Sequence, residues 1–211
     1  MRGIQVDATR FRQLRRARGL KQTELAQLAG VGERTVRNAE AGRRVRLDFL
    51  SYLATALGVE VSDVVHDHDE LRTALREEKR ADHILLAIEA LAKERDMSEF
   101  LNLVAENIVV NIPGPKESPI RGEYRGVDGI RTLGDRSQIS VEYERAPEIS
   151  EIRTGGNLVI ISGRDWQRAI PTGKSAIIEW LHIYEFDKGR IVRLDDIAID
   201  STSIATMFRP G

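Results

Sequence analysis

The sequence predicts an all-α domain followed by an α+β domain with a curved antiparallel sheet. Short amphipathic helical patterns separated by glycines occupy the first 66 residues. Long strand patterns separated by glycine-containing turns occupy the chain after residue 139. The expected domains are therefore residues 1–66 and 84–211, with a charged helical connector at 67–83.

Charge is divided unevenly between the two halves. Residues 1–66 carry twelve Lys or Arg against seven Asp or Glu, a net charge of +5, and the remainder has a net charge of −6. A basic segment of this kind is typical of a module that binds a polyanion. The absence of cysteine excludes disulfides and thiolate chemistry. Because no apolar run approaches about 18 residues, we expect a cytoplasmic protein without membrane spans.

The first domain has the pattern of five short helices. We expect them at about 10–18, 22–29, 33–41, 48–57 and 61–65. Thr9 is the expected cap of the first helix, and Gly30 supplies the positive-φ corner between the second and the third. Arg43-Arg44-Val45-Arg46 is expected to be a basic loop.

A set of core and corner residues carries a family resemblance: Gln22, Glu24-Leu25-Ala26, Ala29-Gly30-Val31, Glu40, Gly42, Leu53-Ala54 and Leu57-Gly58-Val59. With them, residues 9–65 resemble the helix-turn-helix domains of the lambda-repressor-like, xenobiotic-response-element family. Gly32 departs from the family, which usually has Ser or Thr there, at a cost of a few tenths of a kcal/mol in helix capping. The resemblance implies that residues 33–41 form a recognition helix for the DNA major groove.

Polar side chains at the starts of two helices and in the basic loop are the candidate DNA contacts: Gln22, Thr23, Glu33, Arg34, Thr35, Arg37, Asn38, Arg43, Arg44 and Arg46. Arg34 or Arg37 suits guanine, and Asn38 suits adenine. The resemblance implies that Gln22 holds a phosphate, and the three loop arginines would add phosphate contacts. The alternative is a solvated basic face on a protein-interaction module. One small domain usually needs two half-sites for specific binding, so we expect a homodimer.

The connector is rich in charge, and His66 and His68 lie at its start. With no cysteine and mainly acidic neighbours, this pair does not make a convincing metal site. We assign no metal, cofactor or catalytic residue from the sequence.

The second domain begins with helical patterns and ends in a meander. We expect helices at about 84–92 and 98–104, a strand at 108–112, a loop at 122–126, a helix at 127–133, and strands at 139–153, 158–170, 175–186 and 190–199. Pro147 predicts a bulge or an edge in the first of the long strands.

Three segments carry a second resemblance: Val109-Val110-Asn111-Ile112-Pro113-Gly114, Gly122-Glu123-Tyr124-Arg125-Gly126, and His182-Ile183-Tyr184 with Gly189-Arg190-Ile191. Residues 81–206 are similar to the nuclear transport factor 2-like (ketosteroid-isomerase-like, SnoaL-like) cone fold. The resemblance implies a deep pocket between the sheet and its helices, and frequent dimerisation.

The turns predict which side chains share a face of the sheet. If Ile170 pairs with Lys174 and Phe186 with Arg190, then Arg164 lies beside Trp180, and Trp180 beside Asp196. The resulting candidate ligand pocket gathers aromatic and polar side chains: Tyr124, Arg164, Trp166, Trp180, His182, Tyr184 and Asp196. Such a face suits a small apolar or aromatic ligand. The alternative is that these aromatics are core, or that the arginine stacks at a dimer contact.

The two resemblances together favour a DNA-binding transcription regulator, acting as a repressor, with a sensing or dimerisation domain. An enzyme of the cone fold with an accessory DNA-binding domain is the alternative. Its acid or base would be Asp196 or His182, with Tyr124 or Tyr184 as hydroxyl donors. A fold does not fix a reaction.

Overall fold

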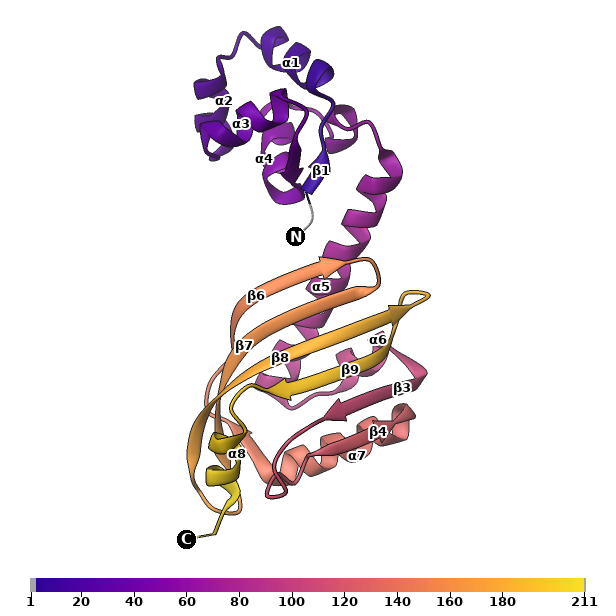
Figure 1. Cartoon of the computed structure of the whole chain (residues 1–211), viewed down its shortest axis with the longest axis vertical. Helices are drawn as coiled ribbons and strands as arrows, with labels where there is room; N and C mark the ends of the chain where they lie inside the picture. Colours follow the sequence, from indigo (N-terminus) through magenta and orange to yellow (C-terminus); the bar gives the residue numbers. More distant parts are fainter. Residues whose placement is uncertain (1–2, 211) are drawn as a thin grey trace. The chain divides into compact units, whose positions relative to one another are not determined.

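The computed structural model describes residues 3–210. These residues form two compact units, one up to Glu78 and one from Lys79 onward, and each is described on its own. Their elements are labelled in Figure 1.

The N-terminal unit is helical with a small β-ribbon. Its elements are β1 (Gly3–Gln5), α1 (Ala8–Ala17), α2 (Gln22–Ala29), α3 (Glu33–Glu40), β2 (Arg44–Arg46), α4 (Leu47–Ala56) and the 3-10 helix η1 (Val61–Val64). The predicted helices are present, although the fifth is only a 3-10 turn. Gly30 has a φ of 64°, which confirms the predicted corner between α2 and α3. The first helix is capped by Asp7, whose side chain accepts from the Arg10 N–H, so the prediction of Thr9 as the cap was wrong.

Three of the four residues of the predicted basic loop form strand β2, and only Arg43 lies outside it. Val45 pairs with Ile4, and both side chains are buried in the helical core. The arginines on either side of Val45 point outward and are exposed. The sequence pattern missed this ribbon because each strand has only three residues and its partner lies about 40 positions away.

The predicted connector is the start of one long helix, α5 (His68–Glu94). Leu71 is 6% exposed and belongs to the N-terminal core, whereas Ile84 is fully buried in the C-terminal core. The helix therefore continues through the 84–92 segment that we expected to be a separate element. The two compact units divide between Glu78 and Lys79, within this helix.

The C-terminal unit is an α+β domain. After α5 come α6 (Ser98–Leu103), β3 (Val104–Ile112), β4 (Gly122–Arg125), α7 (Gly126–Ser140), β5 (Val141–Tyr143), β6 (Glu148–Gly155), β7 (Leu158–Ala169), β8 (Ser175–Asp187), β9 (Arg190–Ala198) and α8 (Ser201–Phe208). The predicted loop at 122–126 is strand β4, and the predicted helix at 127–133 extends to Ser140. The predicted strand at 139–153 is divided into β5 and β6, with Pro147 in the break.

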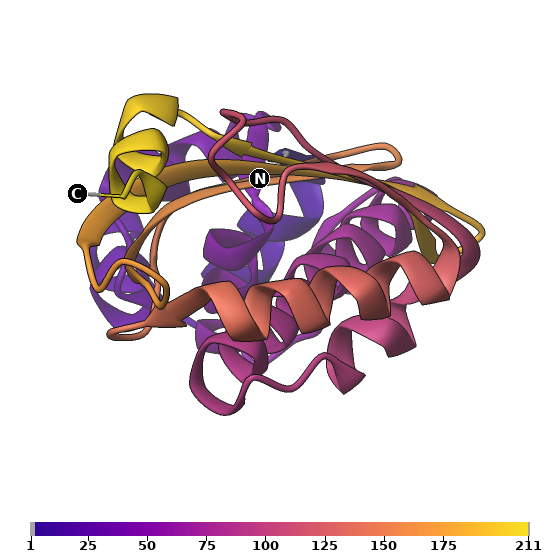
Figure 2. The ribbon, with the colours of Figure 1, turned by 90° about the horizontal axis from the view of Figure 1, so that it is seen from below.

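The sheet has the order β4-β3-β9-β8-β7-β5, with β6 also paired to β7. All pairings are antiparallel except β3 with β9. Figure 2 shows the sheet curving over helix α7, with α8 at one end. Side chains on the inner face, such as Ile161 and Tyr184, pack with Ile84 of α5 and Ile130 of α7 to form the core. No described helix is long and apolar enough to cross a membrane.

Candidate functional site

A cavity of about 150 Å³ lies between the inner face of the sheet and the helices of the C-terminal unit. Most of its wall is aliphatic or aromatic, with Ile88 and Leu91 from α5, Phe100 from α6 and Leu133 from α7. Five titratable side chains also line it: Tyr143, Asp165, His182, Tyr184 and Asp196. No lysine or arginine is among the described lining residues. An apolar chamber with a few convergent polar groups is typical of a small-molecule site.

His182 is held by side chains on three sides. Its Nε2 lies 3.2 Å from Asp196 Oδ1, and its Nδ1 lies 3.0 Å from the Tyr184 hydroxyl. The imidazole stacks on Trp180 with ring centroids 4.1 Å apart. The contact with Asp196 follows from the sheet, because His182 and Asp196 are cross-strand partners. A carboxylate on one ring nitrogen and a hydroxyl on the other fix the ring orientation.

Asp165 and Trp180 leave polar atoms unpaired beside this network. Asp165 is 8% exposed and Trp180 is 3% exposed. Among the described residues, Asp165 Oδ1 and Trp180 Nε1 have no hydrogen-bond partner. Burial raises the pKa of Asp165, although the nearby Trp180 indole and the Gln167 amide partly offset it. The Trp180 indole N–H forms no hydrogen bond of normal geometry with Asp165, but it is close enough to lower the pKa of the carboxyl. This buried donor and buried acceptor therefore lie near each other in the cavity wall, where one entering group can bond both.

Gly163 explains why the indole can lie so close to strand β7. It is the cross-strand partner of Trp180. A Cβ atom at this position would lie 2.7 Å from Trp180 Cζ2 and 2.5 Å from the Glu148 carbonyl oxygen. Only glycine gives the ring this space, so the position of Trp180 depends on the absence of a side chain at Gly163.

The tyrosines of the cavity hold their protons firmly. Burial raises the pKa of Tyr184 well above its usual value, and the negative charge of Asp196 adds to the effect. Burial likewise raises the pKa of Tyr143. Both phenols therefore remain neutral hydrogen-bonding groups at neutral pH.

The predicted register was wrong by one residue in the β7–β8 hairpin. Ala169 rather than Ile170 pairs with Lys174, because the Ile170 N–H donates to the Ser140 carbonyl on the other side of β7. In the β8–β9 hairpin Asp187 pairs with Arg190, because Lys188 joins Gly189 in having a positive φ and shortens the loop. A β-bulge after Glu185 shifts the register by one more residue, so that Tyr184 pairs with Leu194 and His182 with Asp196. The even-numbered residues of β8 and β9 therefore share one face of the sheet, as predicted.

The slip moves two predicted pocket residues to the outer face of the sheet. Arg164 pairs with Glu179 and binds Glu148, and Trp166 stacks against Arg145, so neither lines the cavity. Tyr124 is also outside the lining, with its hydroxyl donated to the Ile120 carbonyl 2.8 Å away. Trp180, His182, Tyr184 and Asp196 do lie in the cavity wall.

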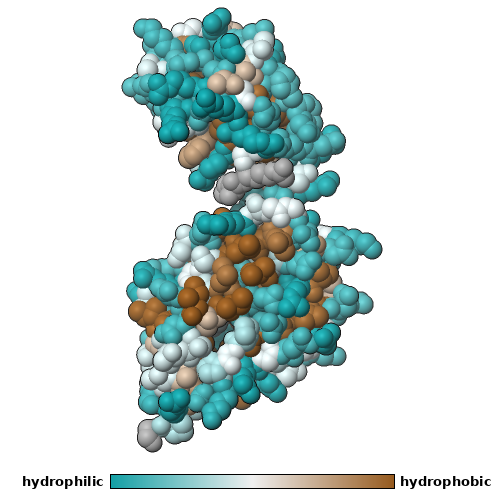
Figure 3. Space-filling model, viewed as in Figure 1, coloured by the Kyte–Doolittle hydropathy of each residue, from teal (hydrophilic) through white to brown (hydrophobic). Residues whose placement is uncertain are grey.

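The outer face that receives these residues has an apolar centre. Figure 3 shows hydrophobic side chains gathered over the strands of the sheet. Ile160 and Ile183 are cross-strand partners there, as are Leu181 and Ile197. They are only partly buried.

The N-terminal unit presents its candidate DNA contacts on helices α2 and α3. Glu33, Arg34 and Arg37 are exposed, and Thr35 and Asn38 are half-buried. Val36 and Ala39, on the other side of α3, are fully buried and fix the rotation of the helix. The polar face of α3 is therefore free to meet a partner.

Beneath this face, Glu40 joins three helices. Its carboxylate accepts from Arg15 Nε of α1 at 2.5 Å and from Gln22 Nε2 of α2 at 2.6 Å. Burial alone would raise the pKa of Glu40, but the bonds from Arg15 and Gln22 outweigh it and the pKa is lowered. The side chain of Gln22, a predicted phosphate contact, is therefore engaged inside the fold. Thr23 beside it is exposed.

Comparison with known proteins matches each unit to a different family. Residues 8–66 match the sequence model of a helix-turn-helix domain. Residues 86–194, more than half of the chain, match that of a SnoaL-like domain. The chain belongs to the SnoaL-like family. No curated protein matches the chain.

Solved structures support the fold of the SnoaL-like domain. A nuclear transport factor 2-like protein from Burkholderia xenovorans is 21% identical with a TM-score of 0.54, covering 63% of this chain and 98% of that one. A candidate isomerase from Bacillus subtilis is 25% identical with a TM-score of 0.51, covering 63% of this chain and 94% of that one. The predicted fold class, a helix-turn-helix unit before a cone-shaped α+β domain, is confirmed.

Sequence reasoning missed the acidic residue that matters most in the SnoaL-like cavity. Asp165 is not among the predicted pocket residues, because the predicted β7–β8 register puts the neighbouring Arg164 and Trp166 on the cavity face instead. The signal that could have found it is Gly163, since a glycine inside a strand indicates close approach of another group. Among the described residues, no cluster of three or more His, Cys, Asp or Glu could hold a metal ion.

Proposed function

We propose that the protein is a DNA-binding transcription regulator whose SnoaL-like domain binds a compact, uncharged ring compound carrying a hydroxyl group. The observation that carries the ligand assignment is the neighbouring pair of Asp165 Oδ1 and Trp180 Nε1, neither of which has a hydrogen bond of normal geometry to a described residue, in a mainly apolar cavity. We propose repression as the output, because it requires only that a DNA-binding dimer occupy its operator.

The chemistry of the pair restricts the ligand. A single hydroxyl can donate to the Asp165 carboxylate and accept from the Trp180 indole N–H. The described lining has no lysine or arginine to neutralise a ligand carboxylate, and it already holds Asp165 and Asp196. An apolar cavity of about 150 Å³ is of the size that holds one benzene-sized ring. A phenol-like molecule meets all three requirements.

Calorimetric titration with phenol, toluene and benzoate tests this assignment. We expect phenol to bind at least about tenfold more tightly than toluene, because the hydroxyl satisfies both buried atoms. We expect no measurable binding of benzoate. Toluene binding as tightly as phenol, or benzoate binding more tightly, would show that the Asp165–Trp180 pair does not select the ligand.

The outer face of the sheet supports homodimerisation. Ile160, Leu181 and Ile183 form an apolar centre, and the ion pairs Arg164–Glu148 and Arg193–Asp195 lie around it. A face with both charge signs around an apolar centre can meet a copy of itself about a twofold axis. Sedimentation analysis of Leu181→Glu should give monomers where the parent chain gives dimers. A dimer that survives this substitution would place the interface elsewhere.

An enzyme is the second candidate, and the His182–Asp196 contact favours it. A histidine held by a carboxylate next to an apolar chamber is a suitable general base. The similar Bacillus subtilis protein is itself a candidate isomerase. This reading requires turnover that is lost in Asp196→Asn while ligand binding persists. We propose the sensor because the cavity is joined to a DNA-binding unit in one chain.

A further inference from the structure

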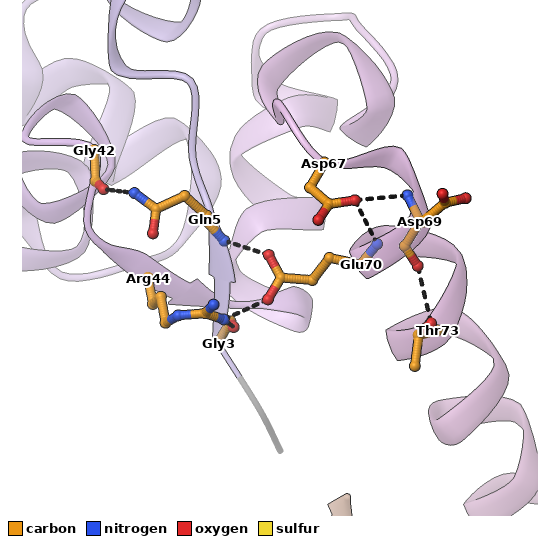
Figure 4. A network of polar contacts seen from close by, with 8 residues as sticks. All are labelled: Gly3, Gln5, Gly42, Arg44, Asp67, Asp69, Glu70 and Thr73. Carbon is orange, nitrogen blue, oxygen red and sulfur yellow. Dashed lines mark hydrogen bonds and ion pairs between the residues drawn. The ribbon is translucent and has the colours of Figure 1, made fainter. Parts of the chain in front are cut away.

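Glu70, in the first turn of helix α5, forms hydrogen bonds to the β1–β2 ribbon of the N-terminal unit. Its Oε1 accepts from Arg44 Nη1 at 2.5 Å, and its Oε2 accepts from the Gln5 backbone N–H at 3.3 Å. Figure 4 shows the carboxylate between the two strands and the helix. Arg44 also donates to the Gly3 carbonyl at 2.7 Å. One acidic side chain thus binds both strands of the ribbon.

The position of Glu70 is fixed from both ends of its own helical turn. Asp67 Oδ1 accepts from the Asp69 and Glu70 N–H groups, each at 2.9 Å, and so caps the helix. Leu71 is buried in the core of the same unit. The capping bonds to Asp67 and the burial of Leu71 therefore keep the Glu70 carboxylate beside Arg44.

Arg44 differs from Arg43 and Arg46 in how far along the sequence its side-chain partner lies. Arg46 pairs with Asp48, two residues away, and Arg43 Nη1 lies 3.4 Å from Asn38 Oδ1 at the end of the recognition helix. The partner of Arg44 lies 26 residues away in a different element. The pair is thus made by the folded arrangement of α5 against the ribbon, not by local sequence.

The two partners also differ in exposure. The Glu70 side chain is 14% exposed, whereas that of Arg44 is 49% exposed. A groove of about 430 Å³ beside them gives the guanidinium room to move. Arg44 directly follows Arg43, whose Nη1 lies 3.4 Å from Asn38 Oδ1 of α3, and it is one of the three arginines expected to contact phosphates. The arginine can turn toward a phosphate, but the carboxylate competes for it.

We propose that Glu70 is an autoinhibitory latch that withholds Arg44 from the DNA backbone. This inference rests on the proposed DNA-binding function. When the first turn of α5 holds Glu70 in place, Arg44 is neutralised and the unit has one phosphate contact fewer. When that turn moves or loosens, Arg44 is released and DNA affinity rises. The latch belongs to the helix whose later residues, including Ile88 and Leu91, line the ligand cavity.

Salt dependence gives the latch a quantitative signature. Each phosphate contact releases condensed counterions and contributes a slope of about −0.9 to log K against log salt. Releasing Arg44 should make this slope steeper by about 0.9 per protomer. It should also tighten binding by roughly fivefold to tenfold per protomer at about 0.1 M salt. The contribution of a phosphate contact to affinity does not depend on the DNA sequence, so a mixed-sequence duplex of about 30 base pairs suffices as the probe.

The test compares Glu70→Gln with Asp69→Asn in the full-length chain. Both substitutions remove one negative charge from the same helical turn, but Asp69 pairs with Arg72 and not with Arg44. Glutamine keeps an oxygen that can accept from the Gln5 N–H, so the ribbon retains that bond. We expect tighter binding and a steeper slope for Glu70→Gln only. We expect Glu70→Gln combined with Arg44→Gln to lose the gain.

Each outcome discriminates. An unchanged slope in Glu70→Gln, or an equal gain in Asp69→Asn, overturns the latch while leaving the DNA-binding function intact. No binding by the parent chain, with binding by Glu70→Gln, supports the latch in its strongest form. If neither the parent nor any variant binds duplex DNA, the proposed function itself fails. Thermal unfolding of each variant shows whether the fold is retained, and an unfolded Glu70→Gln is replaced by Glu70→Ala.

Discussion

The helix-turn-helix unit and the SnoaL-like domain use polar side chains in opposite ways. On α3 the arginines are exposed, and the one buried carboxylate, Glu40, is satisfied by Arg15 and Gln22. In the SnoaL-like cavity the polar atoms are buried, and two of them remain without partners among the described residues. A surface that reads DNA keeps its charges in water, whereas a site for an uncharged ligand offers buried hydrogen-bonding groups that only the ligand satisfies.

The cavity should be the more fragile of the two regions, because it depends on a single missing side chain. Gly163→Ala would place a Cβ atom against Trp180 and the Glu148 carbonyl, where no space exists. We expect the SnoaL-like domain to lose about 3 kcal/mol of stability, as overpacked cores do. Chemical denaturation followed by tryptophan fluorescence reports on this domain, because both tryptophans lie in it. A loss below about 0.5 kcal/mol would show that the indole does not rest on β7.

The helical unit should respond to the loss of the buried carboxylate of Glu40. Glu40→Gln removes the charge that Arg15 and Gln22 bind, and we expect a loss of about 2 kcal/mol. Because the folded pKa of Glu40 is lowered, its contribution is present above the ordinary glutamate pKa and is lost as pH falls through the folded value.

Hydrogen exchange of the α1 and α3 amides measures this effect in the N-terminal unit alone. The parent chain should lose protection as the solution is acidified through that range, and Glu40→Gln should lack this component. If the variant keeps the full acid dependence of the parent, another group is responsible for it.

The contrast between the units also explains what the sequence could predict. Helical phase depends only on local spacing, so the exposed and buried faces of α3 followed directly from Val36 and Ala39. Faces of a sheet depend on register, and a slip of one residue exchanges them. The Ile170 N–H is engaged by Ser140, a contact that the turn sequence Pro171-Thr172-Gly173 does not encode. Asp165 and the β1–β2 ribbon could not be predicted for the same reason, because both depend on pairing between residues that are distant in the sequence.

The register can be tested with the two tryptophans. Trp180→Phe removes the cavity N–H while keeping a ring, and we expect phenol to bind about fivefold more weakly. Trp166→Phe makes the same change on the outer face, and we expect phenol affinity to stay within about twofold of the parent. Equal losses in the two variants would contradict the observed separation of these residues onto opposite faces.

Selection of DNA from a random-sequence pool tests the central claim most directly. We expect the parent chain to enrich two related half-sites with a fixed spacing of about one helical turn, as a dimer of helix-turn-helix units requires. Arg34→Ala should enrich the same sites with the preference at one position per half-site relaxed. Arg43→Ala, which removes an expected phosphate contact, should weaken binding without changing the preferred sequence. No enrichment by the parent chain, or the same sequence preference in Arg34→Ala, would contradict the assignment of α3 as a reader of base sequence.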